Sequence, residues 1–273
     1  MEAQKKRRPI IAFVLSLLTP GLGQLYNGQI KRATIFYLGM LSVVTILILS
    51  GLVSTFWGHI FVLAVAIAFF LFVMIDALHN ATRLKEIRIR SYNRWYIYLI
   101  ISLISYFAIA PLIKSIVPFK GYKVPASSMQ PTLFVGDYFI VDKAFYGNKE
   151  PERKDIVVFR YPVDPKKEFI KRVIGLPGDK IEIQGRQVIV NDQPLEENYV
   201  FTSHTASSPT KHNVRDHFGP LIVPDRKLFV LGDNRDHSLD SRFWGFVDIS
   251  DLTGKALYIY WAKDRGRIGK EIR

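Results

Sequence analysis

The sequence predicts a helical membrane domain over residues 1–117, followed by a mostly antiparallel β domain over residues 118–273. The first half contains three long uncharged apolar runs, each near or above the ~20 residues that a helix needs to cross a bilayer. Beyond Gly121 the apolar runs become short and are separated by turn residues, as in strands. Residues 1–117 hold 12 Lys+Arg against 3 Asp+Glu, and the remainder holds 25 against 21. A basic excess in the apolar half indicates a phospholipid membrane, and not nucleic acid, as the partner.

The N-terminal segment combines a basic head at residues 5–8 with a short apolar run at residues 10–18. A secretory signal peptide begins in this way. Further apolar segments follow, however, and no small-residue cleavage site stands out, which favours an uncleaved membrane domain. The run closes at a Pro- and Gly-rich turn within residues 19–28. We predict a re-entrant or interfacial hairpin over residues 9–30, because the basic segments on either side of it then share one face of the membrane.

Three transmembrane helices are predicted, at about residues 33–57, 59–78 and 95–117. Buried core helices are the alternative for each run, and three such runs in one half of the chain favour the membrane. The positive-inside rule assigns the basic residues at 5–8, 31–32 and 83–94 to the cytoplasm, so that the β domain is extracytoplasmic. If the hairpin were a complete span, the β domain would be cytoplasmic. The charges favour the first arrangement.

The second half contains short strand-like runs between turns, with no long helix and no long repeat. Six strands are predicted, at residues 138–141, 156–161, 169–174, 180–183, 187–190 and 227–231. The polar stretch at residues 204–217 is interpreted as an exposed excursion. The chain has no cysteine, which excludes disulfides, thiol nucleophiles and cysteine-based metal sites.

Two adjacent hydroxyls, those of Ser127 and Ser128, lie between Pro125 and Pro131. The two prolines prevent a simple helix through this stretch. A serine close to proline is most often a turn hydroxyl, so this pair alone indicates little about chemistry.

Lys171 lies in the predicted strand at residues 169–174, where alternation places Phe169, Lys171 and Val173 on one face. Apolar neighbours on the same face would desolvate the ammonium group and lower its pKa. A neutral lysine amine can act as a general base toward a serine hydroxyl. A snorkelling lysine with a hydrated head group is the commoner outcome, and the strand alone favours that alternative.

The loop at residues 232–242 is dense in Asp, Asn, Arg and Ser. Its three Asp residues could supply oxygens to calcium, but their spacing does not fit an EF-hand and two Arg residues would compete with the ion. We therefore expect Asp–Arg ion pairs that hold the loop rigid beside an active site. Neither a metal nor a cofactor is expected.

Five ordered segments of the second half resemble the sequence boxes of bacterial type I signal peptidases. They lie at residues 125–133, 136–143, 155–159, 171–179 and 232–242. Each segment by itself is a weak indication of the family, but five segments in the same order and with matching spacing are a specific one. The resemblance covers about residues 122–261 and is uninformative about residues 1–94. It implies a membrane-bound serine endopeptidase of the bacterial inner or plasma membrane, with a signal-peptidase-like β fold. Such an enzyme removes N-terminal signal peptides from exported precursors with a Ser/Lys dyad, cutting after Ala-x-Ala-like sites.

The resemblance also implies roles for individual residues. Ser128 matches the nucleophile, Lys171 the general base, and Ser238 the hydroxyl that orients the lysine amine. The residues expected to support them are Ser127, Asp233, Arg235, Asp240 and Arg242, the last two as an ion pair. The substrate is expected to bind as an added β-strand. Residues that match the first side-chain pocket are Val124, Pro125, Met129, Leu133, Phe169 and Ile170, and those near the second are Tyr122, Phe139 and Val158. Ala126 belongs to the same predicted substrate-binding set.

Two positions depart from the family pattern. Ala126 stands where many members carry a Ser that helps to hold the oxyanion, and Ser127 stands where Gly is common. The Ser128 backbone N–H can still donate, although losing one oxyanion donor costs on the order of 3 kcal/mol in a well-studied protease. His237 replaces a frequent Asn. A Ser-His-Asp triad through His237 is a weaker alternative, because His237 adjoins Ser238 in a supporting loop.

Two other functions are compatible with parts of the pattern. Related cytoplasmic repressor autoproteases use the same dyad, but the membrane spans and the lack of a DNA-binding region argue against that function. A catalytically impaired membrane scaffold, whose β domain binds extended peptides, is favoured only by Ala126. The intact Ser128, Lys171 and Ser238 argue against it. The expected partners are secretory preproteins and the phospholipid membrane, with the export machinery as a further candidate.

Overall fold

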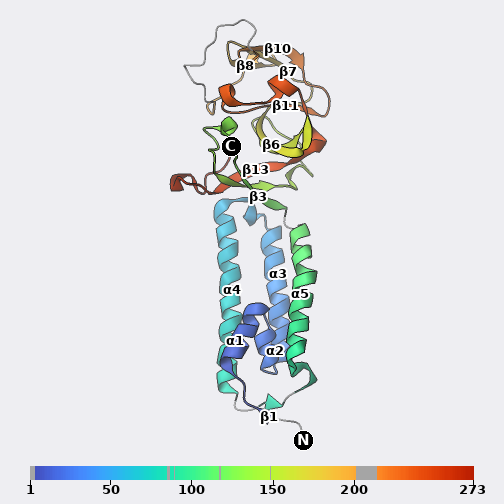
Figure 1. Cartoon of the computed structure of the whole chain (residues 1–273), viewed down its shortest axis with the longest axis vertical. Coiled ribbons are helices and arrows are strands. Elements are labelled where there is room, and N and C mark those ends of the chain that lie inside the picture. Colours follow the sequence, from blue (N-terminus) through green and yellow to red (C-terminus); the bar gives the residue numbers. More distant parts are fainter. Residues whose placement is uncertain (1–3, 85–86, 89, 117, 148, 201–213) are drawn as a thin grey trace. The chain divides into compact units, whose positions relative to one another are not determined.

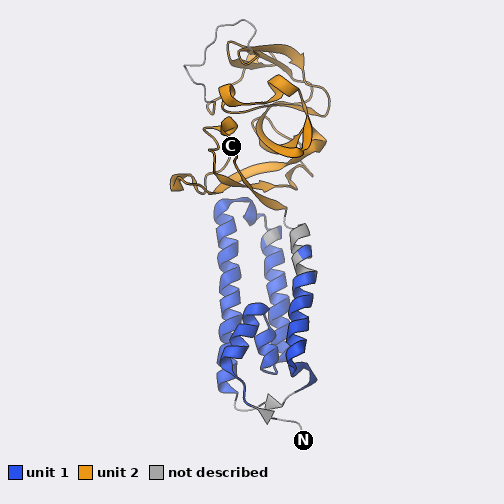
Figure 2. Ribbon diagram, viewed as in Figure 1, with its two compact units in different colours: residues 1–117 blue, residues 118–273 orange. Residues whose placement is uncertain are grey.

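A computed structural model of the chain describes residues 4–84, 87–88, 90–116, 118–147, 149–200 and 214–273 (Figure 1). The chain divides into two compact units, Met1–Val117 and Pro118–Arg273 (Figure 2). Helices form the first unit and antiparallel strands form the second, which confirms the predicted fold class.

Apolar helices make up most of the first unit. They are α1 (Pro9–Leu18), α2 (Leu22–Tyr26), α3 (Ile30–Leu49), α4 (Phe56–Arg83) and α5 (Trp95–Ile116), with the short elements β1 (Gln4–Lys5), η1 (Leu52–Ser54), β2 (Ile87–Arg88) and η2 (Ser91–Asn93). By length and composition, two of the described helices could cross a membrane, α3 over Ile30–Leu47 and the whole of α4. The third predicted span corresponds to α5, whose described apolar stretch is the shorter Trp95–Phe107.

The turn between α3 and α4 lies earlier than the sequence analysis placed it. Gly51 adopts a left-handed conformation with φ +71°, which glycine reaches without a steric penalty. The Thr55 hydroxyl then caps α4 by accepting a hydrogen bond from the Gly58 backbone N–H at 3.2 Å. The predicted boundary at Gly58 is therefore wrong, because the whole region is uncharged and the capping residue, not hydropathy, fixes where the helix begins.

The hairpin formed by α1 and α2 packs against α4. Gly23 lies so close to α1 that a Cβ atom there would be 2.2 Å from the Ala12 carbonyl oxygen. The buried Gln24 side chain donates to Asp76 of α4 at 3.0 Å, and the Asn27 side chain donates to a backbone carbonyl of α4 at 2.8 Å. The ten residues of α1 span about 15 Å, half of a typical hydrocarbon core. This length suits a hairpin that enters and leaves on one side.

Two antiparallel sheets form the second unit. The seven-stranded sheet has the order β12-β11-β6-β5-β13-β4-β3, and the four-stranded sheet has the order β10-β7-β8-β9. The strands of the larger sheet are β3 (Phe119–Lys123), β4 (Tyr138–Asp142), β5 (Ile156–Tyr161), β6 (Asp164–Gly175), β11 (Lys227–Leu231), β12 (Val247–Asp248) and β13 (Leu252–Trp261). Those of the smaller sheet are β7 (Lys180–Gln184), β8 (Gln187–Val190), β9 (Gln193–Pro194) and β10 (His217–Ile222). Short helical turns join them: η3 (Ser127–Met129), η4 (Phe145–Gly147), η5 (Arg235–His237), α6 (Ser241–Trp244), η6 (Ile249–Asp251) and η7 (Arg265–Arg267).

Strand β6 runs from an exposed beginning to a fully buried end. Its neighbours β5 and β11 are themselves rich in buried apolar residues, so the last part of β6 lies between two buried strands. Lys171 is the first residue of this buried part. A strand buried on both faces excludes water from the polar groups that it carries, which is the physical condition for an active-site base.

All six predicted strands are present, but the sequence pattern did not predict β3, β9, β10, β12 or β13. Of these, β13 lies inside the larger sheet. Gly254 interrupts its sequence pattern, and a Cβ atom there would lie 2.2 Å from the Asp142 carbonyl oxygen, so the close approach of two strands requires glycine. Residues 204–213 of the predicted excursion lie outside the described residues. His217, at the end of that stretch, belongs to β10 and not to an excursion.

Candidate active site

Ser128 and Lys171 lie side by side although they are 43 residues apart in the chain. Ser128 is in the short turn η3, and Lys171 is in β6. Lys171 Nζ lies 3.1 Å from Ser128 Oγ, within hydrogen-bond distance. A hydroxyl nucleophile in contact with an amine is the minimum arrangement for nucleophilic catalysis with a lysine base.

The Lys171 side chain is nearly enclosed, with the residue only 4% exposed. Its amine donates to the Ile170 carbonyl oxygen at 2.8 Å and lies 5.3 Å from the centroid of the Phe169 ring. Burial lowers the pKa of Lys171 to about 8, against the smaller opposing effects of the Asp240 and Asp233 carboxylates. A substantial fraction of the amine is therefore neutral near pH 8 and able to accept a proton.

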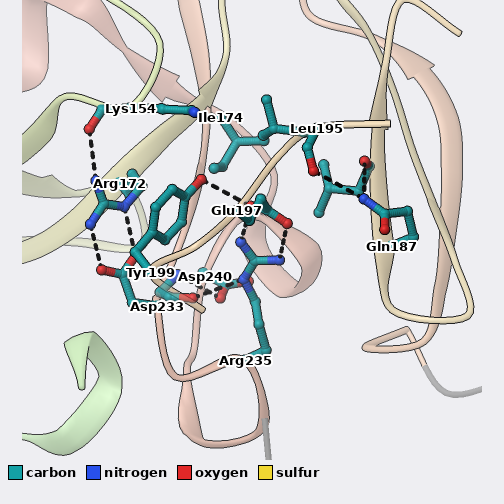
Figure 3. A network of polar contacts seen from close by, with 12 residues as sticks. Lys154, Arg172, Ile174, Gln187, Leu195, Glu197, Tyr199, Asp233, Arg235 and Asp240 are labelled. Carbon is teal, nitrogen blue, oxygen red and sulfur yellow. Dashed lines mark hydrogen bonds and ion pairs between the residues drawn. The ribbon is translucent and has the colours of Figure 1, made fainter. Parts of the chain in front are cut away.

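The opposite face of β6 carries Arg172, which is 1% exposed. Its guanidinium donates to both carboxylate oxygens of Asp233, at 2.8 and 2.6 Å, and to the Lys154 carbonyl oxygen at 3.0 Å (Figure 3). The Thr132 hydroxyl donates to the same carboxylate at 2.5 Å. These contacts fasten the beginning of the loop at residues 232–242 to the strand that carries Lys171.

The same loop holds the turn that carries the nucleophile. The Asn234 backbone N–H donates to the Ser128 carbonyl oxygen at 3.1 Å, and its side-chain amide donates to the Ser127 carbonyl oxygen at 3.2 Å. Gly232 lies equally close, since a Cβ atom there would be 2.5 Å from the Ser128 carbonyl oxygen and 2.2 Å from Ser238 Oγ. Position 232 therefore requires glycine, because any side chain there would collide with the Ser128 backbone.

Asp240 and Arg242 form the ion pair expected within the loop. Arg242 donates to both carboxylate oxygens of Asp240 at 2.8 Å, and both side chains are almost fully buried. Burial alone would raise the pKa of Asp240, but the hydrogen bonds and charge of Arg242 hold it below its ordinary value. Asp240 also accepts from the Gly232 backbone N–H at 3.1 Å. The pair therefore ties the end of the loop to its beginning.

Ser238 lies beside the dyad but does not contact the lysine amine. Its hydroxyl is buried and lies near the Asp240 carboxylate, whose pKa it helps to lower. His237 lies in the same loop, and its Nδ1 is 3.3 Å from the Asn234 side-chain oxygen. Through this contact, the His237 side chain helps to hold the loop.

The residues predicted to bind substrate divide into two groups. Those that are at most 2% exposed are Val124, Met129, Leu133, Phe139 and Val158, and all five belong to one hydrophobic cluster. Those that reach the surface at least in part are Tyr122, Pro125, Ala126, Phe169 and Ile170. The buried group forms the floor beneath the Ser128 turn, and direct contact with a substrate is open only to the second group.

The acidic side chains of the site are engaged with arginine. Within the described residues, no group of three or more His, Asp or Glu side chains could hold a metal ion. The alternative of a calcium loop at residues 232–242 therefore has no support in the geometry.

Comparison with known proteins places this geometry in a family. A family model described as "Signal peptidase, peptidase S26" matches residues 95–261. The chain belongs to this family. It is a serine peptidase of the signal peptidase I type, and its activity is the removal of signal peptides.

Several curated relatives of this family are similar to the chain. Signal peptidase I of Leptolyngbya laminosa is 42% identical over 155 residues, which cover 54% of this chain and 71% of that protein. Probable signal peptidase I-2 of Synechocystis is 42% identical over 148 residues, covering 52% and 63%. Signal peptidase I of Aquifex aeolicus is 31% identical over 194 residues, covering 52% and 76%.

The sequence analysis missed several residues that build this signal peptidase site. They are Thr132, Arg172, Glu197, Tyr199 and Asn234, whose contacts join segments far apart in the chain. Strand alternation places Arg172 on the face of β6 opposite to Lys171, but the carboxylate that meets it lies 61 residues away. Side-chain alternation predicts the face on which a residue lies and not its distant partner.

Proposed function

We propose that the chain is a membrane-anchored serine endopeptidase in which Ser128 and Lys171 form the catalytic dyad. The 3.1 Å contact between Ser128 Oγ and Lys171 Nζ, in a nearly enclosed site, carries this proposal. The substrates are exported preproteins, which are cut after Ala-x-Ala-like sequences.

The first half of the reaction forms an acyl-enzyme. Neutral Lys171 accepts the proton of the Ser128 hydroxyl as the oxygen attacks the carbonyl carbon before the scissile bond. The Ser128 backbone N–H donates to the developing oxyanion, and the methyl group of Ala126 offers no second donor. The protonated Lys171 then gives its proton to the leaving amine, so that the peptide bond breaks and Ser128 carries the signal peptide as an ester.

The second half of the reaction releases the signal peptide. Lys171, neutral again, takes a proton from a water molecule, whose oxygen attacks the ester carbonyl. The bond between that carbonyl carbon and Ser128 Oγ then breaks, protonated Lys171 returns the proton to Ser128 Oγ, and the signal peptide leaves with a free carboxyl group. The Ile170 carbonyl oxygen already accepts a hydrogen bond from the amine, which limits its rotation. The buried Ser238 hydroxyl, which lies close to Gly232 and to the Asp240 carboxylate, would turn toward the amine when the site is occupied.

The substrate would enter as an extended strand beside the nucleophile turn. The small substrate side chains at the first and third positions before the cut would pack over the buried hydrophobic cluster that contains Met129 and Leu133. Tyr122 and Phe169 are partly exposed and are candidates for direct contact.

The first unit, residues 1–117, would anchor the enzyme in the bilayer. A multi-pass anchor at residues 33–57, 59–78 and 95–117, with the hairpin at residues 9–30 on the cytoplasmic side, would leave the catalytic unit on the extracytoplasmic face. Signal peptides emerge at that face, so an anchored enzyme would meet them at a high local concentration.

The decisive experiment is cleavage of a secretory precursor with an Ala-x-Ala site, in detergent, by the wild type and by Ser128→Ala and Lys171→Ala. We expect cleavage after the last Ala by the wild type only, with each variant folded as judged by circular dichroism. Cleavage retained in Lys171→Ala would remove the lysine from the mechanism. A folded but inert wild type would favour the peptide-binding scaffold, and Ala126→Ser would then test whether one oxyanion donor restores activity.

A further inference from the structure

The segment that follows β9 contacts both β6 and the loop at residues 232–242, which we name the active-site loop. We name residues 195–200 the strap. Its side chains alternate, with Leu195, Glu197 and Tyr199 turned inward and Glu196 and Asn198 exposed. Two hydrogen bonds join the Leu195 backbone to β8. The Leu195 N–H donates to the Val188 carbonyl oxygen, and the Leu195 carbonyl oxygen accepts from the Gln187 side chain (Figure 3). The strap is therefore anchored in the smaller sheet.

Glu197 holds Arg235, which lies in the active-site loop. Both oxygens of the Glu197 carboxylate accept hydrogen bonds from the Arg235 guanidinium, one of them at 3.1 Å, and the two side chains are 9% and 6% exposed. Arg235 Nε also donates to the Gly232 carbonyl oxygen at 3.1 Å. The carboxylate thus fixes a guanidinium that itself fixes the loop backbone beside Ser128 and Ser238.

Tyr199 holds Arg172, which lies in β6. Its ring stacks on the guanidinium, with the Arg172 Cζ atom 3.8 Å from the ring centroid. The Tyr199 hydroxyl donates to Glu197 at 3.0 Å, and burial together with the Glu197 charge raises the pKa of Tyr199, so that the hydroxyl stays protonated. Arg172 in turn grips Asp233 through two hydrogen bonds.

The two contacts of the strap flank one residue, Asn234. Asp233 is held through Arg172 and Tyr199, and Arg235 is held through Glu197. Asn234 between them makes the two hydrogen bonds to the backbone of the Ser127–Met129 turn. Arg172 is also the chain neighbour of Lys171. The strap therefore supports both members of the dyad at once, the nucleophile through Asn234 and the base through β6.

We propose that Glu197 and Tyr199 are positioning residues for the Ser128–Lys171 dyad, an inference that rests on the proposed function. Neither side chain touches the reacting atoms. Their effect is exerted through Arg235 and Arg172, and it sets the separation of the hydroxyl and the amine. A displacement of about 1 Å in a reacting pair can slow a reaction by about 10²-fold.

The alternative is that the strap only stabilises the catalytic unit. The two interpretations differ in what a substitution changes. A purely structural contact alters the melting temperature and leaves the turnover of the folded enzyme intact. A positioning contact lowers kcat at unchanged KM, because substrate binding does not involve it. Loss of a positioning contact also changes the pH dependence of kcat. An unpaired Arg235 is free to move toward Asp233 and Asp240, the carboxylates that raise the pKa of Lys171, and would weaken their effect.

The test compares Glu197→Gln and Tyr199→Phe in the full-length enzyme in detergent, with a peptide that contains an Ala-x-Ala site. Glu197→Gln keeps the volume and removes the charge, and we expect kcat to fall tenfold or more with KM within twofold of the wild type. The apparent pKa in its rate profile should fall below that of the wild type. Tyr199→Phe keeps the stacked ring and removes the hydroxyl, and we expect a smaller loss of kcat, about threefold.

Tyr146→Phe is the matched control. It removes a hydrogen bond to the Asp155 carboxylate at 2.9 Å, in the same unit but outside the strap, the loop and β6. It should lower the melting temperature without lowering kcat. A kcat for Glu197→Gln equal to that of the control would overturn the proposal, as would a loss confined to KM. If Glu197→Gln does not fold, Tyr199→Phe and Tyr199→Leu decide, since an unchanged kcat in both leaves the strap no positioning role. A wild type that does not cleave the peptide would overturn the dyad and the strap proposal together.

Discussion

The two faces of β6 carry adjacent buried cations with opposite surroundings. Lys171 is 4% exposed and Arg172 is 1% exposed, so both are withdrawn from water. In the described part of the chain, Lys171 forms no ion pair, and its amine contacts a hydroxyl and a backbone carbonyl. Arg172 is gripped by both oxygens of Asp233. The two buried cations therefore differ in their partners, which are a carboxylate for Arg172 and a hydroxyl and a carbonyl for Lys171.

The chemistry of the two side chains matches these surroundings. An arginine guanidinium keeps its charge in proteins, so a buried arginine requires a paired anion. A lysine amine can lose its proton when it is buried, and the pKa of Lys171 falls to about 8. The first arrangement produces a rigid structural clamp, and the second produces a base. Exchanging each residue for an apolar one of similar length separates these roles.

The largest effect on stability is expected for Arg172→Met. The substitution leaves the Asp233 carboxylate buried without its guanidinium, and breaking a buried pair from one side costs about 3–5 kcal/mol. The measurement is the melting temperature of the full chain in detergent. The double variant with Asp233→Leu should recover much of the loss, because it removes the unpaired charge. A single variant as stable as the wild type would show that the Asp233 carboxylate finds another partner.

Replacing the neighbouring Lys171 by Met should stabilise the folded protein, whereas Arg172→Met should destabilise it. Lys171→Met removes a cation whose pKa is about 8 in the folded protein and near 10.5 in the unfolded chain. The unfolded chain thus binds this proton more tightly, and at pH 7 the wild type is destabilised by about 3 kcal/mol relative to a neutral residue. We expect Lys171→Met to be inactive but more stable at pH 7. The difference should shrink as the pH rises from 8 to 10.5, and a difference that does not vary with pH would mean that packing, not charge, causes it.

The sequence predicted the members of the site better than their contacts. Ser128 and Lys171 stand in motifs whose order and spacing resemble a known family, and strand alternation predicted the face that Lys171 shares with Phe169. We expected the Asp and Arg residues of the loop at residues 232–242 to pair with one another. Asp240 and Arg242 do so, and they are two residues apart.

The remaining pairs join distant segments, and local pattern cannot predict them. Asp233 pairs with Arg172 across 61 residues, and Arg235 pairs with Glu197 across 38 residues. Which charges meet depends on the order of strands in the sheet, and that order depends partly on β13, which the analysis missed. The Gly254 interruption that hid β13 is explained only when its close approach to β4 is seen.

The smallest effect concerns the rate, and it tests the lysine face of β6 without any substitution. If neutral Lys171 is the base, kcat/KM should rise about tenfold per pH unit below pH 8 and level off near pH 9, as the amine loses its proton. Measurements between pH 6 and 10, with the wild type shown to remain folded throughout, would locate the inflection. Arg172 cannot produce such an inflection, because a guanidinium keeps its proton throughout this range. A rate that is flat from pH 6 to 8 would require a base that is already neutral at pH 6. A rate that keeps rising to pH 10.5 would mean that the Lys171 amine is hydrated in the working enzyme, and the contrast between the two faces of β6 would then be lost.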